Sequence, residues 1–210
     1  MDTRVLKIDK DSPQQDSMVI AADIIRKGGI VAFPTETVYG LAANYNDQRA
    51  LEKIYQVKDR PKSKPLTIQI EDKNRIKQFV GDLSPAVRRI VDTFWPGPLT
   101  IIFSLDNDKK IGIRVPDNKV AISLIKRAGA PIVAPSANTS GNRPPRTAQE
   151  VLRDMDGKID LVLDAGSTDI GLESTVLDVS ALPFKILREG AITKKEITAL
   201  ATKDIKIEIS

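Results

Sequence analysis

Short apolar segments alternate with longer amphipathic segments along the chain of 210 residues, a pattern typical of α/β proteins. Apolar runs bounded by turn formers predict strands at 5–8, 30–33, 66–70, 99–105, 111–115, 131–134, 161–164, 174–179 and 185–188, and an edge strand at 205–209. Helical periodicity predicts helices at 16–27, 47–57, 71–80, 84–94 and 118–128, and two more that begin at 147 and 193.

Residues with capping side chains stand at the predicted helix starts. Asp16 or Ser17 would cap the first helix, and Ser84 followed by Pro85 is a cap with a proline in the first turn. The other expected caps are Asp47, Asn118, and the capping boxes of Thr147 with Glu150 and Thr193 with Glu196.

Two pairs of predicted strands are close enough in the sequence to form hairpins. Residues 106–108 are turn formers between the strands 99–105 and 111–115, and the strand 174–179 can pair with 185–188 across residues 180–183. Hairpins add antiparallel neighbours to the sheet. We therefore expect a single α/β domain over residues 1–210, with a twisted mixed parallel/antiparallel sheet flanked by helices.

The composition is that of a soluble globular protein, with 41% hydrophobic and 29% charged residues. No apolar run approaches the length of a membrane span, and the N-terminus lacks the apolar core of a signal peptide. We expect a cytoplasmic protein that has no membrane partner.

The chain has no cysteine and no histidine. This excludes disulfides, thiolate nucleophiles, Cys/His zinc sites, Ser-His-Asp triads and imidazole bases. Any catalysis must rely on lysine, arginine, carboxylates, hydroxyls, backbone amides or bound Mg²⁺, an inventory that suits transfer at a phosphorus centre. The net charge of +4 permits binding of a nucleotide or RNA but does not distinguish them.

A polar cluster follows the apolar run at 30–33, where Pro34 ends the predicted strand. It contains Thr35, Glu36 and Thr37, and small residues follow from Gly40. Polar loops at strand ends are where α/β proteins bind ligands. An ordinary turn between a strand and a helix would have the same composition, so both interpretations stay open at this stage.

The segment 58–65 places four cations within seven residues and also contains two prolines. Proline restricts the backbone of this loop, so its cations need not all extend into water. Arg60 can bind a phosphate through two parallel hydrogen bonds, and Lys58 and Lys64 can act as point charges. A solvated basic loop is the alternative.

A second polar loop, at 135–146, contains Ser136 and Asn138 directly after a predicted strand. It could hold a phosphate or a ribose, although it lacks the P-loop sequence, and a surface loop of turn formers is the alternative. Arg114 and Arg188 end predicted strands, and Ser174 begins one. Together these residues indicate a site for a nucleotide and a small anionic substrate.

Seven segments, in order along the chain, resemble the YrdC-type family of threonylcarbamoyl-AMP synthases in its short single-domain form. They are FPTETVYGL at 33–41, KDRP at 58–61, KPL at 64–66, RVP at 114–116, APSANTSG at 134–141, ESTV at 173–176 and REG at 188–190. The resemblance covers about residues 15–192 and leaves 193–210 as a C-terminal tail. It implies a YrdC-like fold with a large concave basic surface.

The resemblance implies a nucleotidyltransferase that joins L-threonine, bicarbonate and ATP into threonylcarbamoyl-AMP and releases pyrophosphate. The product would serve the formation of N6-threonylcarbamoyladenosine at position 37 of tRNA. The implied cofactor is Mg²⁺ bound through the ATP phosphates, with no metal ligand from the protein. Further partners it suggests are tRNA and the downstream threonylcarbamoyl transferase machinery.

The same resemblance implies roles for individual residues. Lys58 and Arg60 would be catalytic by neutralising charge on the phosphates. Gln69 stands where many relatives place a histidine, and Arg114 would pair with the α-carboxylate of threonine. The implied threonine-binding residues are Thr35, Gln69, Arg114, Ala134 and Ser174, and the implied ATP-binding residues are Lys58, Arg60, Lys64, Lys110, Ser136, Asn138, Pro144 and Arg188.

Two other functions are considered. A non-catalytic module that binds double-stranded RNA or tRNA would use the basic surface without needing Thr35 or Arg114. A domain that adenylates carbamoyl phosphate usually forms part of a much longer chain. A related subgroup with no assigned synthase role lacks the Lys-x-Arg and Ser-x-Asn pairs, whereas this sequence has both, as Lys58/Arg60 and Ser136/Asn138.

Overall fold

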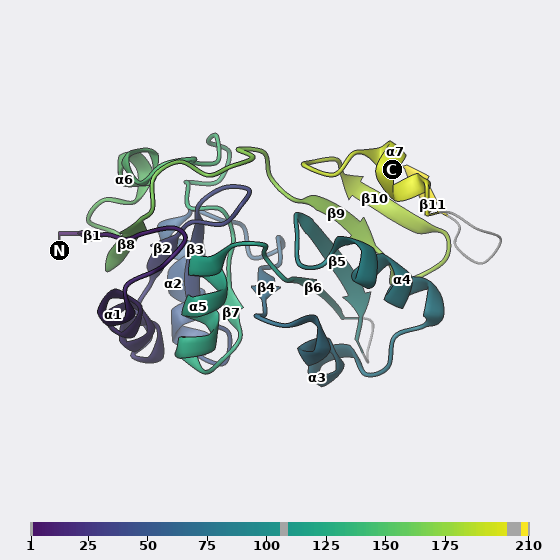
Figure 1. The fold of residues 1–210 in the computed structure, drawn as a ribbon, viewed down its shortest axis with the longest axis horizontal. Helices are drawn as coiled ribbons and strands as arrows, with labels where there is room; N and C mark the ends of the chain where they lie inside the picture. Colours follow the sequence, from purple (N-terminus) through teal and green to yellow (C-terminus); the bar gives the residue numbers. More distant parts are fainter. Residues whose placement is uncertain (1, 106–108, 201–206, 210) are drawn as a thin grey trace.

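Figure 1 shows the fold in a computed structural model, which describes residues 2–105, 109–200 and 207–209. The described strands form one mixed sheet of eleven strands in the order β1-β8-β2-β3-β7-β4-β6-β5-β9-β10-β11. Their bounds are β1 Arg4–Lys7, β2 Val31–Phe33, β3 Gly40–Asn44, β4 Thr67–Gln69, β5 Leu99–Ser104, β6 Lys110–Arg114, β7 Ile132–Val133, β8 Leu161–Asp164, β9 Thr175–Asp178, β10 Phe184–Arg188 and β11 Ile207–Ile209. The predicted mixed α/β sheet is confirmed.

Most helices begin at the predicted caps. The side chains of Asp47, Ser84, Asn118, Thr147 and Thr193 each accept a hydrogen bond from a main-chain amide of the first turn. The bounds are α1 Gln15–Arg26, α2 Gln48–Val57, η1 (a 3₁₀ helix) Lys73–Ile76, α3 Lys77–Val80, α4 Pro85–Phe94, α5 Lys119–Ala128, α6 Ala148–Met155 and α7 Lys194–Thr198. None of the described helices is long and apolar enough to cross a membrane.

In the first half of the sheet, from β1 to β7, helices cover both faces (Figure 1). Val31 and Phe33 of β2 pack with α1 and α5 on one face, whereas Ala32 packs with α2 and α6 on the other. This alternation follows from the two-residue period of a strand. Burial on both faces explains why these strands are apolar throughout.

In the second half, the core lies on one face only. Ile68 of β4, Ile101 of β5 and Ile113 of β6 pack with α4 in the third apolar cluster. Their sequence neighbours point to the opposite face and belong to none of the three apolar clusters of the described residues. Figure 1 shows α4 on one side of β5 and β6. The uncovered face of this half is therefore where the fold leaves room for a ligand.

Several predicted elements differ from the observed ones. Helix α1 begins at Gln15 after Gln14, which makes no side-chain cap, so Asp16 and Ser17 lie inside the first turn. Glu150 accepts from the Arg146 amide instead of completing a capping box with Thr147. The segment at 71–80 begins only after Asp72, which caps η1. The predicted turn at 106–108 and the first part of the strand predicted at 205–209 lie outside the described residues.

One strand was missed. The sequence pattern predicts no strand at 40–44, whereas these residues form β3, which pairs antiparallel with β2. The turn between these strands consists of the polar cluster around Thr35. Strands are predicted mainly from β-branched and aromatic residues, and the sequence Gly-Leu-Ala-Ala-Asn at 40–44 contains none.

Candidate active site

A pocket of about 380 Å³ lies on the uncovered face of the second half of the sheet. Its floor is made by alternate residues of β4, β5, β6 and β9. These are Thr67, Gln69, Thr100, Ile102, Lys110, Gly112, Arg114, Val176 and Asp178. The walls come from the turn after β2, the loop after α2, the loop after β7 and the residues around Ser174. The sheet thus brings segments distant in sequence to one site.

Gly112 keeps the middle of this floor open. A Cβ atom at this position would lie 3.5 Å from Oγ1 of Thr67 and 3.6 Å from Cγ2 of Thr100. Those are ordinary contact distances, so a side chain would fit there without a clash but would occupy the pocket. The absence of a side chain at Gly112 therefore leaves space in the pocket for a ligand.

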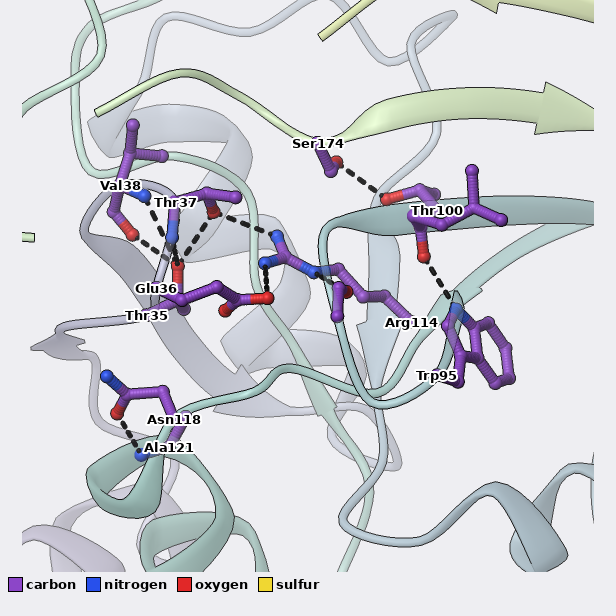
Figure 2. A network of polar contacts seen from close by, with 12 residues as sticks. Thr35, Glu36, Thr37, Val38, Trp95, Thr100, Arg114, Asn118, Ala121 and Ser174 are labelled. Atoms are coloured by element: carbon purple, nitrogen blue, oxygen red, sulfur yellow. Dashed lines mark hydrogen bonds and ion pairs between the residues drawn. The ribbon is translucent and has the colours of Figure 1, made fainter. Parts of the chain in front are cut away.

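The buried side chain of Arg114 lines the pocket. Figure 2 shows its guanidinium facing Glu36 and Thr37. Its Nη2 forms an ion pair of 2.7 Å with Oε1 of Glu36, and its Nη1 donates to Oγ1 of Thr37 at 3.0 Å. Its Nε donates to the main-chain oxygen of Gly97 at 3.1 Å. A Cβ at Gly97 would lie 2.6 Å from the oxygen of Phe94, so only glycine fits at this position. Three residues from two separate segments therefore fix the orientation of Arg114.

Two hydroxyls and an amide lie on the floor close to Arg114. Ser174 and Thr100 are buried, and their hydroxyl oxygens are 2.9 Å apart (Figure 2). Gln69 faces Arg114 across the β4–β6 pair, and its buried Oε1 has no hydrogen-bond partner among the described residues. A buried oxygen without a partner is costly unless a ligand or water donates to it. This part of the pocket can therefore bind a small molecule that has a carboxylate and donor groups.

Two further arginines line the pocket. Arg188 donates from Nη2 to the main-chain oxygen of Ser174 at 2.8 Å and from Nη1 to Glu173 at 2.7 Å. Arg60 is held by its own loop, through the main-chain oxygens of Lys64 and Pro65. Burial lowers the pKa of Arg60, and the positive charge of Arg188 acts in the same direction. The charge of Arg188 is thus close enough to lower the pKa of Arg60. Two neighbouring guanidinium groups make this part of the pocket suitable for a polyanion.

The side chain of Lys58 lies behind the pocket wall instead of lining it. It is 1% exposed, and its Nζ donates to the main-chain oxygens of Ser136 and Asn138. The amide of Ser140 in turn donates to the main-chain oxygen of Lys58 at 2.7 Å. The Lys-x-Arg and Ser-x-Asn pairs of the sequence therefore meet in space. Lys58 holds the loop that presents Ser136 to the pocket.

The charge of Lys58 is unusually easy to remove. Burial, reinforced by the Arg60 cation, lowers the pKa of Lys58 to about 8, while Glu173 and Asp154 act in the opposite direction. The same carboxylate of Asp154 accepts from the Thr139 amide and the Asn142 side chain. It thereby contributes to the order of the loop that Lys58 holds.

The structure brings most of the predicted site residues to one pocket. Those that line it are Arg60, Gln69, Lys110, Arg114, Ala134, Ser136, Ser174 and Arg188. Thr35, Lys58, Lys64, Asn138 and Pro144 do not. The hydroxyl of Thr35 donates to the main-chain oxygen of Val38 at 2.7 Å, so it shapes the turn. Asn138 donates to the main-chain oxygens of Thr139 and Asn142, and Lys64 is exposed.

Sequence reasoning missed several pocket residues. Thr67, Thr100, Glu173 and Asp178 line the pocket but are not among the predicted site residues. Thr100 could be found by extending the two-residue period of β6 to the paired strand β5. Thr37 and Glu36 belong to the polar cluster after Pro34; Thr37 lines the pocket, and Glu36 lies directly behind Arg114.

Residues 23–190 match the Sua5/YciO/YrdC family model, which carries the description "Telomere recombination". The chain belongs to this family. The family resemblance of the seven motifs is thereby confirmed. The chain is also 40% identical, over 202 residues, to the threonylcarbamoyl-AMP synthase of Bacillus subtilis strain 168, a match that covers 91% of this chain and 58% of that protein.

Two other Sua5/YciO/YrdC relatives extend the comparison. The putative threonylcarbamoyl-AMP synthase of Methanocaldococcus jannaschii is 36% identical, with 80% of this chain and 83% of that protein covered. The crystal structure of Pyrococcus abyssi Sua5 complexed with L-threonine superposes with a TM-score of 0.91 at 35% identity, over 98% of this chain and 63% of that one. The chain thus spans little more than half the length of the Bacillus relative.

Proposed function

We propose that this chain catalyses the synthesis of threonylcarbamoyl-AMP from L-threonine, bicarbonate and ATP. The observation that carries the proposal is a single pocket with two kinds of anion site, the oriented Arg114 beside hydroxyls and the pair Arg60 and Arg188. Arg114 and Lys110 lie at opposite ends of β6. Four residue steps of a strand separate them by roughly 13 Å. The pocket floor along β6 is therefore long enough for an amino acid and a nucleotide bound side by side.

The relatives support the same assignment. Proteins named threonylcarbamoyl-AMP synthase share 40% and 36% identity with this chain, and the similar Pyrococcus protein was crystallised with L-threonine. The chain has no histidine and no cysteine. A reaction that needs no protein nucleophile is consistent with that composition.

The proposed chemistry follows from the residues of the pocket. Arg114 would bind the α-carboxylate of threonine, with Ser174 and Gln69 beside it. The threonine amine and bicarbonate would form a carbamate with loss of water. A carbamate oxygen would then attack the α-phosphorus of ATP as the bond from that phosphorus to the bridging oxygen breaks, and pyrophosphate would leave. Arg60 and Arg188 would stabilise the negative charge on the phosphates.

The proposed Mg²⁺ would be bound mainly through the ATP phosphates. The pocket carboxylates Glu173 and Asp178 are paired with Arg188 and Lys110. The described residues contain no group of three carboxylates or other metal-ligating side chains that could hold an ion by themselves. When bound with ATP, the ion would supply charge neutralisation at the phosphates.

The test is pyrophosphate release from ATP and Mg²⁺, measured with threonine and bicarbonate omitted in turn. We expect release only when both are present, and Arg60→Ala should lower the rate by a hundredfold or more because a phosphate-binding guanidinium is lost. Arg75→Ala is the matched control, since Arg75 forms an ion pair with Glu71 outside this pocket. Release that continues without threonine would contradict the proposal.

We further propose tRNA and the downstream transferase machinery as partners, which would approach the large concave basic surface that the family resemblance implies. A protein that releases no pyrophosphate under any condition but binds tRNA, with affinity that falls steeply as salt rises, would be an RNA-binding module instead. Release that requires carbamoyl phosphate in place of threonine and bicarbonate would indicate the related adenylation reaction.

A further inference from the structure

Glu36 is a buried carboxylate that the proposed reaction does not use directly. It is 6% exposed, does not line the pocket, and precedes Thr37 in the turn after β2. Its Oε1 forms an ion pair of 2.7 Å with Nη2 of Arg114, and neither of its oxygens has a hydrogen-bond partner among the described residues. Burying a carboxylate is costly, so a purely structural turn would be better served by an uncharged residue.

The hydrogen-bond inventory of Arg114 suggests what Glu36 does. A guanidinium has five N–H groups in a planar fork. Gly97 accepts the hydrogen on Nε, Thr37 accepts one on Nη1, and Glu36 faces Nη2 (Figure 2). The contact with Glu36 is an ion pair without hydrogen-bond geometry, so one hydrogen on Nη1 and both hydrogens on Nη2 have no hydrogen-bond acceptor among the described residues. Two parallel donors on one guanidinium match the two oxygens of a carboxylate.

We propose that Glu36 is a positioning residue that orients Arg114 for an amino-acid carboxylate. This inference rests on the proposed function, because it assumes that threonine binds at Arg114. The carboxylate of Glu36 acts through Arg114 and does not touch the substrate. Its loss should therefore change threonine binding without a matching change in nucleotide binding.

The experiment compares Glu36→Ala and Glu36→Gln with the wild type. We expect Glu36→Ala to raise the Kd and the KM for L-threonine by tenfold or more, while kcat at saturating threonine and the KM for ATP change by less than threefold. Glu36→Gln keeps an oxygen that can accept from Nη2, so its Kd for threonine should stay within threefold of the wild type. The nitrogen NMR signal of Arg114 Nε should persist in Glu36→Gln and broaden in Glu36→Ala.

Glu71→Ala is the matched control, because Glu71 pairs with Arg75 at the same distance of 2.7 Å outside this pocket. It should leave both substrate affinities unchanged. Equal losses of threonine and ATP binding in Glu36→Ala would show general damage and overturn the inference, as would unchanged threonine binding or a Glu36→Gln variant as weak as Glu36→Ala. A wild-type protein that binds no threonine would overturn the proposed function and this inference together, so the two failures are distinguishable.

Discussion

Lys58 shows how one residue can serve a binding site without lining it. Its ammonium group reaches the main-chain oxygens of Ser136 and Asn138 from behind the wall, and the positive charge of Arg60 lies close enough to lower the pKa of Lys58. A neutral amine keeps two N–H donors, enough for both oxygens. Deprotonation therefore removes the charge and can leave the loop in place.

This separation predicts a pH dependence of nucleotide binding. The pKa of Lys58 is about 8, so below pH 8 the free protein already carries the charge. Above pH 8 it must take up a proton to regain that charge, and the Kd for a non-hydrolysable ATP analogue should rise by up to about tenfold per pH unit. Calorimetric titrations at pH 7, 8 and 9 measure this. In Lys58→Met the dependence should vanish, and an equal dependence in that variant would contradict the assignment.

Raising the pH should weaken nucleotide binding, but it should have the opposite effect on the stability of the fold. The folded-state pKa of Lys58 lies below the unfolded value of 10.5, so burying the charged form destabilises the protein fully below about pH 8. The penalty disappears as pH rises from about 8 to 10.5. Over this range, the free energy of unfolding of the wild type should therefore rise relative to that of Lys58→Met.

Among the local elements, the end of α2 determines where the two cations of the Lys-x-Arg pair point. The Asp59 amide donates to the oxygen of Gln56, and the Arg60 amide donates to that of Tyr55, which is the hydrogen-bond pattern of a Schellman motif. Asp59 has a φ of 49°, a left-handed conformation unusual for a residue other than glycine. This reversal sends Lys58 into the interior and Arg60 to the pocket.

The conformation of Asp59 can be tested by substitution. Asp59→Gly should raise the free energy of unfolding by up to about 1 kcal/mol because glycine adopts this φ without strain. Asp59→Val should lower it by about 1–2 kcal/mol, since a β-branched residue is strained there. Urea unfolding measures both variants, and Asp117, an exposed loop residue, offers the same two substitutions as a control. A Val variant as stable as the Gly variant would rule out strain at this turn.

The helix caps and the main strands were predictable because they depend on residues close in the sequence. Asn118 accepts from the Ala121 amide as expected, and Ser84 caps α4. The pairing of Glu36 with Arg114 was not predictable, since it joins segments 78 positions apart that meet only through the sheet order. The placement of Lys58 behind the wall was hidden for a related reason. A basic loop does not reveal which of its cations is buried.

For the whole molecule, the important feature is the narrow connection between the two halves of the sheet. Only the two-residue strand β7 lies between β3 and β4, with Val133 opposite both Ala43 and Ile68. The two edge strands of the described sheet, β1 and β11, lie at opposite ends of the molecule (Figure 1). The pocket spans this connection, because Ser136 follows β7 whereas Arg114 and Ser174 belong to the second half.

A ligand that contacts both halves should therefore stabilise the connection more than the edges. We expect L-threonine with Mg²⁺ and a non-hydrolysable ATP analogue, each well above its Kd, to slow hydrogen exchange at the amides of Val133 and Ala134 by tenfold or more. The amide of Arg4 in edge strand β1, which donates to the oxygen of Asp160, should change by less than twofold because it opens by local fraying. Arg60→Ala with the same ligands is the control and should show little protection at β7. Equal slowing at β1 and β7 would mean that the ligands stabilise the protein only as a whole, and the narrow connection would then have no separate role.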